Sequence, residues 1–317
     1  MLQTGDNRPL ARSTQRPSGF CLLLATVALA VAAAVGGAGG VAARVAPSPC
    51  GARAATRPVV THVIWIWFEN HASHEILGSP AAPRINTAAR ACGLATNYAG
   101  VSHPSLPNYL AATSGSTHGI ADDGPPAAHP IRSISIFEQA RSAGSYEESM
   151  PGRCRSTDAY PYAPKHNPEV YYLGARARCA AGDVPLGTTS RGAFSTALAK
   201  GTLPAFSFVT PNLCNDMHDC PVSVGDAWLG RWLDRITASP TYRAGHTVVF
   251  VVWDEDDGSA ANRVPLIVVS PWTHPGTRSA ARFDHDSLLR TTEELLGIRA
   301  YLGQAASAPS LSPAFGL

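Results

Sequence analysis

Four short runs of apolar residues stand out along the chain. They are "HVIWIWF" (62–68), "AFSFVT" (205–210), "TVVFVVW" (247–253) and "VPLIVVS" (264–270). Each run is continuous rather than alternating with polar residues, which is typical of strands that are covered on both faces. We therefore expect four buried strands in the middle of a sheet.

Segments with helical spacing of apolar residues alternate with these strands. The expected helices span 106–114, 135–143, 226–238 and 286–296. Strands that alternate with helices predict an α/β fold, with a mostly parallel central sheet flanked by helices on both faces. The region 145–200 is rich in Gly, Pro, Tyr and Cys, so we expect an insertion of long loops there.

The N-terminal segment has the pattern of an export signal. Three arginines precede an apolar run from Phe20 to Val35, and small residues follow at Val41 and Ala43. The run is shorter than the ~20 residues of a spanning helix, which favours a signal peptide over the alternative of an uncleaved membrane anchor. We expect a secreted or cell-envelope protein with a signal peptide at 1–43, a flexible lead-in at 44–58, a catalytic domain at 59–305 and a C-terminal tail at 306–317.

Composition and net charge limit the classes of partner that the chain is expected to bind. The chain has 317 residues, of which 45% are hydrophobic and 15% charged, so it can bury a large core. Its net charge is +2, and its 25 Lys and Arg residues are almost all Arg scattered along the chain. Nucleic-acid binding relies on a broad basic field. We therefore expect no nucleic-acid partner, and we expect a monomer.

The cysteines agree with export. Six remain after the predicted signal, an even number in a chain bound for an oxidising compartment. Local spacing favours Cys214 with Cys220 and Cys154 with Cys179, which leaves Cys50 with Cys92, although spacing alone leaves the pairing open. A zinc site at Cys214 and Cys220 is the alternative, but no CxxC pair supports it.

Two acidic pairs follow two of the predicted strands directly. Glu69 and Asn70 come after the first run, and Asp254 and Glu255 come after the third. In open α/β sheets ligands collect at the carboxyl ends of the strands. Four oxygen ligands suit one hard divalent cation, Mg²⁺, Ca²⁺ or Mn²⁺, with Zn²⁺ as a further candidate. The alternative is that each pair is an ordinary solvated loop start.

A hydroxyl precedes one predicted helix in "SHPSLPNYLAATSG" (102–115). Ser105 is expected at or just before the helix N-terminus, where backbone N–H groups bind anions. Beside a metal its hydroxyl would be an activated nucleophile for phosphorus, with Asn108 placed to donate to a phosphoryl oxygen. The alternatives are that Ser105 is a plain N-cap and that Asn108 is a surface residue of the first turn.

Four histidines lie among polar or turn-forming residues rather than on an apolar face: His103, His166, His218 and His285. Imidazolium groups stabilise phosphate charge, and one of them could protonate a leaving alkoxide. Any single one is also compatible with a structural role. We expect their segments to converge on one site.

These motifs together resemble a known family. "FENHASHEILG", "SHPSLPNYLAATSG", "APKHNP", "TPNLCNDMHDCPVSVGDAWL", "VVWDEDDG", "VPLIVVSPWTHPGT" and "FDHDSLLRTTEELLGI" are similar, in unbroken order, to the bacterial phosphoesterases of the alkaline phosphatase superfamily. That family contains acid phosphatases and phosphatidylcholine-type phospholipases C. The resemblance covers residues 60 to 300.

The resemblance implies roles for individual residues. Ser105 matches the residue that forms a phospho-enzyme, and Glu69, Asn70, Asp254 and Glu255 match the metal ligands. Further histidines match positions that hold the phosphate: His166, His218 and His285. His103 and Asp216 lie in the same motifs without a defined role, and Asp226 in "GDAWL" is expected to be a helix N-cap. The cysteines beside His218 depart from the family pattern.

We therefore expect a secreted, metal-dependent phosphomonoesterase of the acid phosphatase type that passes through phosphoserine. Its expected substrate is a phosphomonoester, with phosphoinositide head groups at a membrane surface as one candidate. The first alternative is a phospholipase C-type phosphodiesterase, although such lipases often carry long C-terminal extensions. The second is a non-catalytic exported metal-binding protein.

Overall fold

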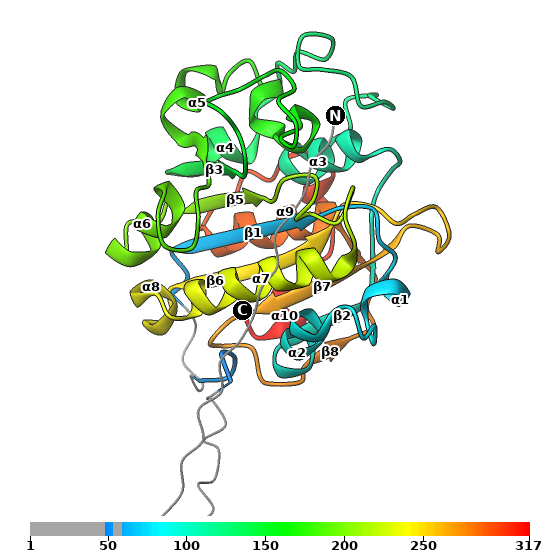
Figure 1. Ribbon diagram of the computed structural model, residues 1–317, viewed down its shortest axis with the longest axis vertical. Coiled ribbons are helices and arrows are strands. Elements are labelled where there is room, and N and C mark those ends of the chain that lie inside the picture. The colour runs from blue at the N-terminus through cyan, green and yellow to red at the C-terminus, as the bar shows by residue number, and fades with distance from the viewer. Residues whose placement is uncertain (1–47, 53–58) are drawn as a thin grey trace, which may run out of the picture. The chain divides into compact units, whose positions relative to one another are not determined.

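A nine-stranded sheet organises the part of the chain that the computed structural model describes, residues 48–52 and 59–317. The predicted signal peptide and most of the lead-in lie outside these residues. The strand order is β4-β3-β5-β1-β6-β7-β2-β8, and β9 also pairs with β2 (Figure 1). The strands are β1 (His62–Phe68), β2 (Gly93–Ala99), β3 (Ala143–Glu147), β4 (Asp183–Pro185), β5 (Phe206–Thr210), β6 (Thr247–Trp253), β7 (Arg263–Val269), β8 (Arg278–Ser279) and β9 (Phe283–Asp284).

Helices cover both faces of this sheet. The α-helices are α1 (Ser73–Ile76), α2 (Pro83–Ala91), α3 (Ser105–Ser114), α4 (Ile136–Gln139), α5 (Arg176–Gly182), α6 (Ala193–Lys200), α7 (Val222–Thr237), α8 (Pro240–Arg243), α9 (His285–Leu295) and α10 (Ser312–Phe315). The 3₁₀ helices are η1 (Pro164–His166), η2 (Pro168–Tyr171) and η3 (Gly303–Ala306). Helix α7 packs with α2, α6 and α8 in front of the sheet, and α3 packs with α9 behind it (Figure 1).

All four predicted strands are confirmed, as β1, β5, β6 and β7. The sheet is mostly parallel, as expected, but β7 runs antiparallel to both β6 and β2. The apolar run could not reveal this direction, because a strand buried on both faces has the same hydrophobic pattern whichever way it runs.

Two predictions for the middle of the chain are wrong. The helix expected at 135–143 ends at Gln139 as α4, and β3 begins at Ala143. The region 145–200 is also more than an insertion of loops, since β4 extends the edge of the sheet and α5 and α6 flank it. The sequence of β3, "AGSYE", is short and carries no continuous apolar run, so its strand signal is weak.

The apolar run of β1 is explained by burial on both faces. Trp65 donates its indole N–H to Thr292 of α9 over 2.9 Å, and the Trp67 ring lies 4.9 Å from that of Tyr109 on α3. Phe68 points to the other face, where its ring meets Trp228 of α7 at 6.0 Å. Successive side chains alternate across the strand, so the run packs against helices on both faces of the sheet.

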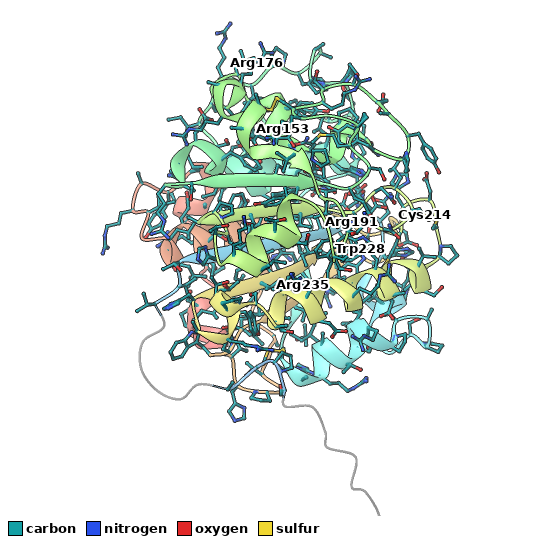
Figure 2. The ribbon with its side chains drawn as sticks, turned by 60° about the vertical axis from the view of Figure 1, so that its left-hand side comes forward. Arg153, Arg176, Arg191, Cys214, Trp228 and Arg235 are labelled. Atoms are coloured by element: carbon teal, nitrogen blue, oxygen red, sulfur yellow. A yellow bond between two sulfur atoms is a disulfide. The ribbon has the colours of Figure 1, made fainter. Side chains whose placement is uncertain are left out.

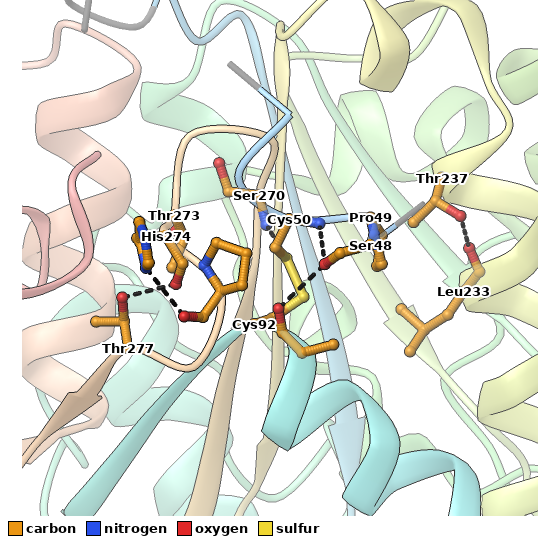
Figure 3. The surroundings of a disulfide bond; sticks show 12 residues. Ser48, Pro49, Cys50, Cys92, Leu233, Thr237, Ser270, Thr273, His274 and Thr277 are labelled. Atoms are coloured by element: carbon orange, nitrogen blue, oxygen red, sulfur yellow. Dashed lines mark hydrogen bonds between the residues drawn. A yellow bond between two sulfur atoms is a disulfide. The ribbon is translucent and has the colours of Figure 1, made fainter. Parts of the chain in front are cut away.

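The three cysteine pairs favoured by spacing are all disulfides: Cys50–Cys92, Cys154–Cys179 and Cys214–Cys220. The zinc interpretation of Cys214 and Cys220 is therefore wrong, because their sulfurs are bonded to each other. The described lead-in residues are attached to the end of α2 in two ways (Figure 3). Cys50 forms its disulfide with Cys92, and the Ser48 hydroxyl donates to the carbonyl oxygen of Ala91.

The C-terminal residues pack against the domain. Leu311 and Phe315 are buried, and the Thr273 hydroxyl donates to the carbonyl oxygen of Phe315 over 2.9 Å. Within the described residues, every helix is too short or too polar to cross a lipid bilayer.

Candidate active site

The two acidic pairs meet at the carboxyl edge of the sheet. Strands β1 and β6 are parallel neighbours with Phe68 opposite Trp253, so Glu69 and Asp254 leave the sheet side by side. The Asp254 N–H donates to the carbonyl oxygen of Phe68 over 3.0 Å, and the Asn70 N–H donates to Asp254 Oδ1 over 3.1 Å. The strand register thus brings the four predicted ligands to one place.

Ser105 is held between these carboxylates. It is the first residue of α3, it is buried, and its hydroxyl donates to Glu69 Oε2 over 2.9 Å. Its oxygen also lies 3.4 Å from Glu255 Oε1. The N-cap residue is Pro104, so the interpretation of Ser105 as a plain N-cap is wrong.

The acidic edge has the chemistry of a cation site. Glu69, Asp254 and Glu255 are buried, and two oxygens shielded from solvent, Asn70 Oδ1 and Asp254 Oδ2, have no hydrogen-bond partner. Buried polar atoms without partners are rare and costly. Carboxylate and amide oxygens are the donors that hard divalent cations prefer. These residues therefore offer the donor chemistry of a divalent-metal site.

The pKa shifts of these carboxyl groups also favour a bound cation. Burial, together with the nearby charges of Glu69 and Glu255, raises the pKa of Asp254 well above its usual range. Burial and Glu69 raise the pKa of Glu255 to about 8. Carboxylates this close resist being charged together, and a bound cation would favour their charged forms.

A buried imidazole completes the inner side of the site. His166, in η1, lies 3.3 Å from Glu69 Oε2 and 3.3 Å from Asp216 Oδ2. Burial alone would lower the pKa of His166, but the two carboxylates outweigh it and raise the pKa to about 9. The same imidazolium outweighs burial at Glu69 and lowers its pKa to about 2. Tyr109 stacks on His166 and donates to Glu69 Oε1.

The loop after β5 contributes His218 and Asp216. Asp216 Oδ1 accepts the His218 N–H over 2.8 Å, and the rings of His218 and His166 lie 5.8 Å apart. The Cys214–Cys220 disulfide closes this loop, and Glu148 connects it to α7 by accepting from Asn215 and from the Trp228 indole. Figure 2 labels Cys214 and Trp228 on the same side of the molecule.

Two predicted phosphate-binding residues are engaged elsewhere. Both ring nitrogens of buried His285 are used, one by the Tyr98 hydroxyl at 2.8 Å and one by the carbonyl oxygen of Asp254 at 2.6 Å. Burial lowers the pKa of His285 to about 4. Asn108 is also buried, so it is not a surface residue. Its amide bonds the backbone of the 101–104 loop and reaches Glu255 Oε2 at 3.4 Å.

His103, one of the four histidines expected to converge on the site, lies beside the acidic edge with its Nδ1 2.7 Å from Glu255 Oε2. Two further charged residues at this edge have no prediction from the sequence. Lys165 and Asp123 pair at 2.9 Å, and Asp123 Oδ1 accepts the Leu106 N–H beside Ser105. The signal for Lys165 was its position directly before His166; Asp123, in a surface loop, carried none.

Asp226 is not the N-cap of its own helix, because α7 begins at Val222. Its carboxylate instead accepts the backbone N–H groups of Arg84 and Ile85, at the start of α2. It therefore caps a neighbouring helix, a role that local spacing could not reveal.

The fold and the acidic edge define a class of phosphoester hydrolases. The chain belongs to the Phosphoesterase family, which matches residues 65–299. It is 31% identical to a phosphatidylinositol-3-phosphatase of Mycobacterium tuberculosis over 84% of this chain and 86% of that protein. It is 30% identical to a phosphate-repressible acid phosphatase of Penicillium chrysogenum, over 74% of this chain but 58% of that enzyme.

Solved structures agree on the fold. A protein of the alkaline phosphatase superfamily from Vibrio parahaemolyticus superposes with a TM-score of 0.51 at 15% identity, covering 82% of this chain and 72% of its own. The expected fold class is therefore confirmed. The family match and the similarity to named phosphatases confirm the expected family and a hydrolase acting on phosphoric esters.

Proposed function

We propose that this protein is a secreted, metal-dependent phosphomonoesterase that attacks its substrate through Ser105. The observation that carries the proposal is the buried Ser105 hydroxyl, bonded to Glu69 at the edge where Asn70 Oδ1 and Asp254 Oδ2 have no partner. The similarity to a phosphatidylinositol-3-phosphatase supports phosphoinositides as candidate substrates. The disulfides support an extracellular location.

The proposed reaction has two steps. The Ser105 oxygen forms a bond to phosphorus as the bond to the leaving group breaks, and the leaving alkoxide takes up the proton that the Ser105 hydroxyl gives up. Water then attacks the phosphoserine, which releases inorganic phosphate and returns a proton to Ser105. A divalent ion held by Glu69, Asn70, Asp254 and Glu255 would stabilise the serine and phosphoryl oxygens. His166 would add positive charge to the phosphate site, and His218 lies next to it, near the surface.

Ser105→Ala tests the nucleophile. The variant should lose nearly all turnover, about 10³-fold or more, while still binding metal and phosphate, because only the attacking oxygen is gone. Quenched reactions of wild-type protein with labelled substrate should leave phosphate on the peptide that contains "SHPSLPNY". An active Ser105→Ala protein would mean that water attacks directly.

A substrate screen separates the alternatives. Purified protein is assayed on phosphomonoesters, phosphodiesters and phosphoinositides, with and without chelator. Faster turnover of diesters would favour the phospholipase C-type activity. No turnover at all, with one bound metal ion per chain, would favour the non-catalytic metal-binding protein. Full activity after verified metal removal would overturn the metal requirement.

A further inference from the structure

We propose that Lys165 binds the phosphate group of the substrate beside His218; this inference rests on the proposed function. The chain uses Arg almost everywhere a basic residue occurs. Of its 25 Lys and Arg residues, 23 are Arg, and the two lysines are Lys165 and Lys200. Lys165 directly precedes His166 in η1, at the acidic edge of the sheet.

The Lys165 ammonium is tied to the backbone next to the nucleophile. It donates to Asp123 Oδ2 over 2.9 Å, and Asp123 Oδ1 accepts the Leu106 N–H over 2.9 Å. Leu106 follows Ser105 in the first turn of α3. A single carboxylate therefore joins the ammonium to the start of the helix that carries the Ser105 hydroxyl.

The ammonium also faces His218. Lys165 Nζ lies 3.5 Å from His218 Nε2, and His218 Nδ1 lies 2.7 Å from Asp219 Oδ1. A neutral imidazole with its proton on Nδ1 satisfies both contacts, a tautomer inferred from these partners. The Lys165 side chain keeps 20% of its surface exposed, so an incoming anion can reach it.

Charge balance explains why such a cation is needed. The three carboxylates proposed as ligands, Glu69, Asp254 and Glu255, carry three negative charges, which one divalent ion and the His166 imidazolium together only balance. A phosphomonoester dianion therefore needs a further cation beside it. Burial would lower the pKa of Lys165, but Glu69 and Asp123 outweigh it and raise the pKa, so the side chain stays charged.

The alternative is that Lys165 only supports the loop that contains Asp123. Asp123→Asn separates the two roles, because Asn keeps an oxygen for the Leu106 N–H and removes the charge that pairs with Lys165. If Lys165 has only a structural role, Asp123→Asn should weaken phosphate binding as much as Lys165→Ala does. If Lys165 binds phosphate, Asp123→Asn should bind phosphate at least as well as wild type, because the ammonium has lost its competing anion.

The experiment measures inorganic phosphate binding to the metal-loaded protein by calorimetry, and KM and kcat for a phosphomonoester. Lys165→Ala should weaken phosphate binding about tenfold or more, as expected for a lost charge-assisted hydrogen bond, and raise KM. Lys165→Arg should restore most of the affinity. Lys200→Ala, at the exposed end of α6, is the matched control and should bind phosphate like wild type.

Three results would overturn the inference: unchanged phosphate affinity in Lys165→Ala, an equal loss in Asp123→Asn, or no phosphate binding by wild-type protein. A failure of the proposed phosphomonoesterase function would give a different set of results. Wild-type protein would then bind phosphate but hydrolyse no phosphomonoester, and the affinities of the variants would still report on Lys165.

Discussion

Asn70 has both an unusual backbone conformation and a side-chain oxygen that is proposed as a metal ligand. Its φ is 49°, in the left-handed region, which Asn tolerates better than most residues. The turn made there lets the Asn70 N–H reach Asp254 Oδ1 while its own side-chain oxygen is left buried without a partner. A substitution at this position can therefore change the backbone, the donor set, or both.

Two variants separate these effects. Asn70→Gly keeps the left-handed turn, so the metal-free protein should unfold like wild type while bound metal falls sharply. Asn70→Ala should lose metal equally and also cost roughly 1 kcal/mol of unfolding free energy, because its Cβ disfavours positive φ. Elemental analysis and denaturant unfolding measure the two quantities. Full metal occupancy in Asn70→Gly would remove Asn70 from the ligand set.

At the scale of elements, the sequence predicts those features whose signal is local. The runs of β1 and β6 are continuous, and their carboxylates follow directly, so the edge that carries Glu69 and Asp254 could be predicted without a structure. The pairing of Lys165 with Asp123 spans 42 residues and depends on the path of two loops. β4 is the edge strand and β3 lies next to it, and both are too short to carry a continuous apolar run.

Helix α2 depends on a residue from another helix. Asp226 of α7 accepts two backbone N–H groups at the start of α2, where the N-cap residue, Ala82, has no side-chain oxygen. Asp226→Ala should lower the free energy of unfolding by about 1–2 kcal/mol, as for lost helix caps, and leave kcat unchanged. Asp226→Asn, which keeps one acceptor, should cost less. Equal stability of all three proteins would contradict the capping role.

For the molecule as a whole, buried acids should make stability depend on pH. Three carboxyl groups are buried in the region 145–200: Glu147, Glu169 and Asp183. Burial and the nearby Asp183 raise the pKa of Glu169 to about 8, and burial raises that of Asp183 to about 7. Unfolded carboxyl groups titrate near 4. Between these values the folded chain binds more protons, so its stability falls as pH rises.

Glu169→Gln should remove part of this dependence. Glu169 faces Asp183, Glu138 and Arg178, and the neutral amide avoids placing a charge among them. The melting temperature of the variant, relative to wild type, should therefore rise from pH 6 to pH 8. Asp158→Asn, an exposed acid in the same region, is the control and should show no such trend. A constant difference between Glu169→Gln and wild type would show that Glu169 does not titrate in this range.

The antiparallel course of β7 has a practical result for handling the protein. The strand ends at the edge of the sheet where β1 and β6 begin, and there the Ser270 N–H donates to Cys50 Sγ (Figure 3). Thr273 binds Phe315 at the same edge, close to Leu317. Ser105 lies at the opposite edge. An affinity tag after Leu317 would thus anchor the protein to a resin or sensor chip with its acidic edge turned toward the solution, which suits lipid-vesicle capture assays.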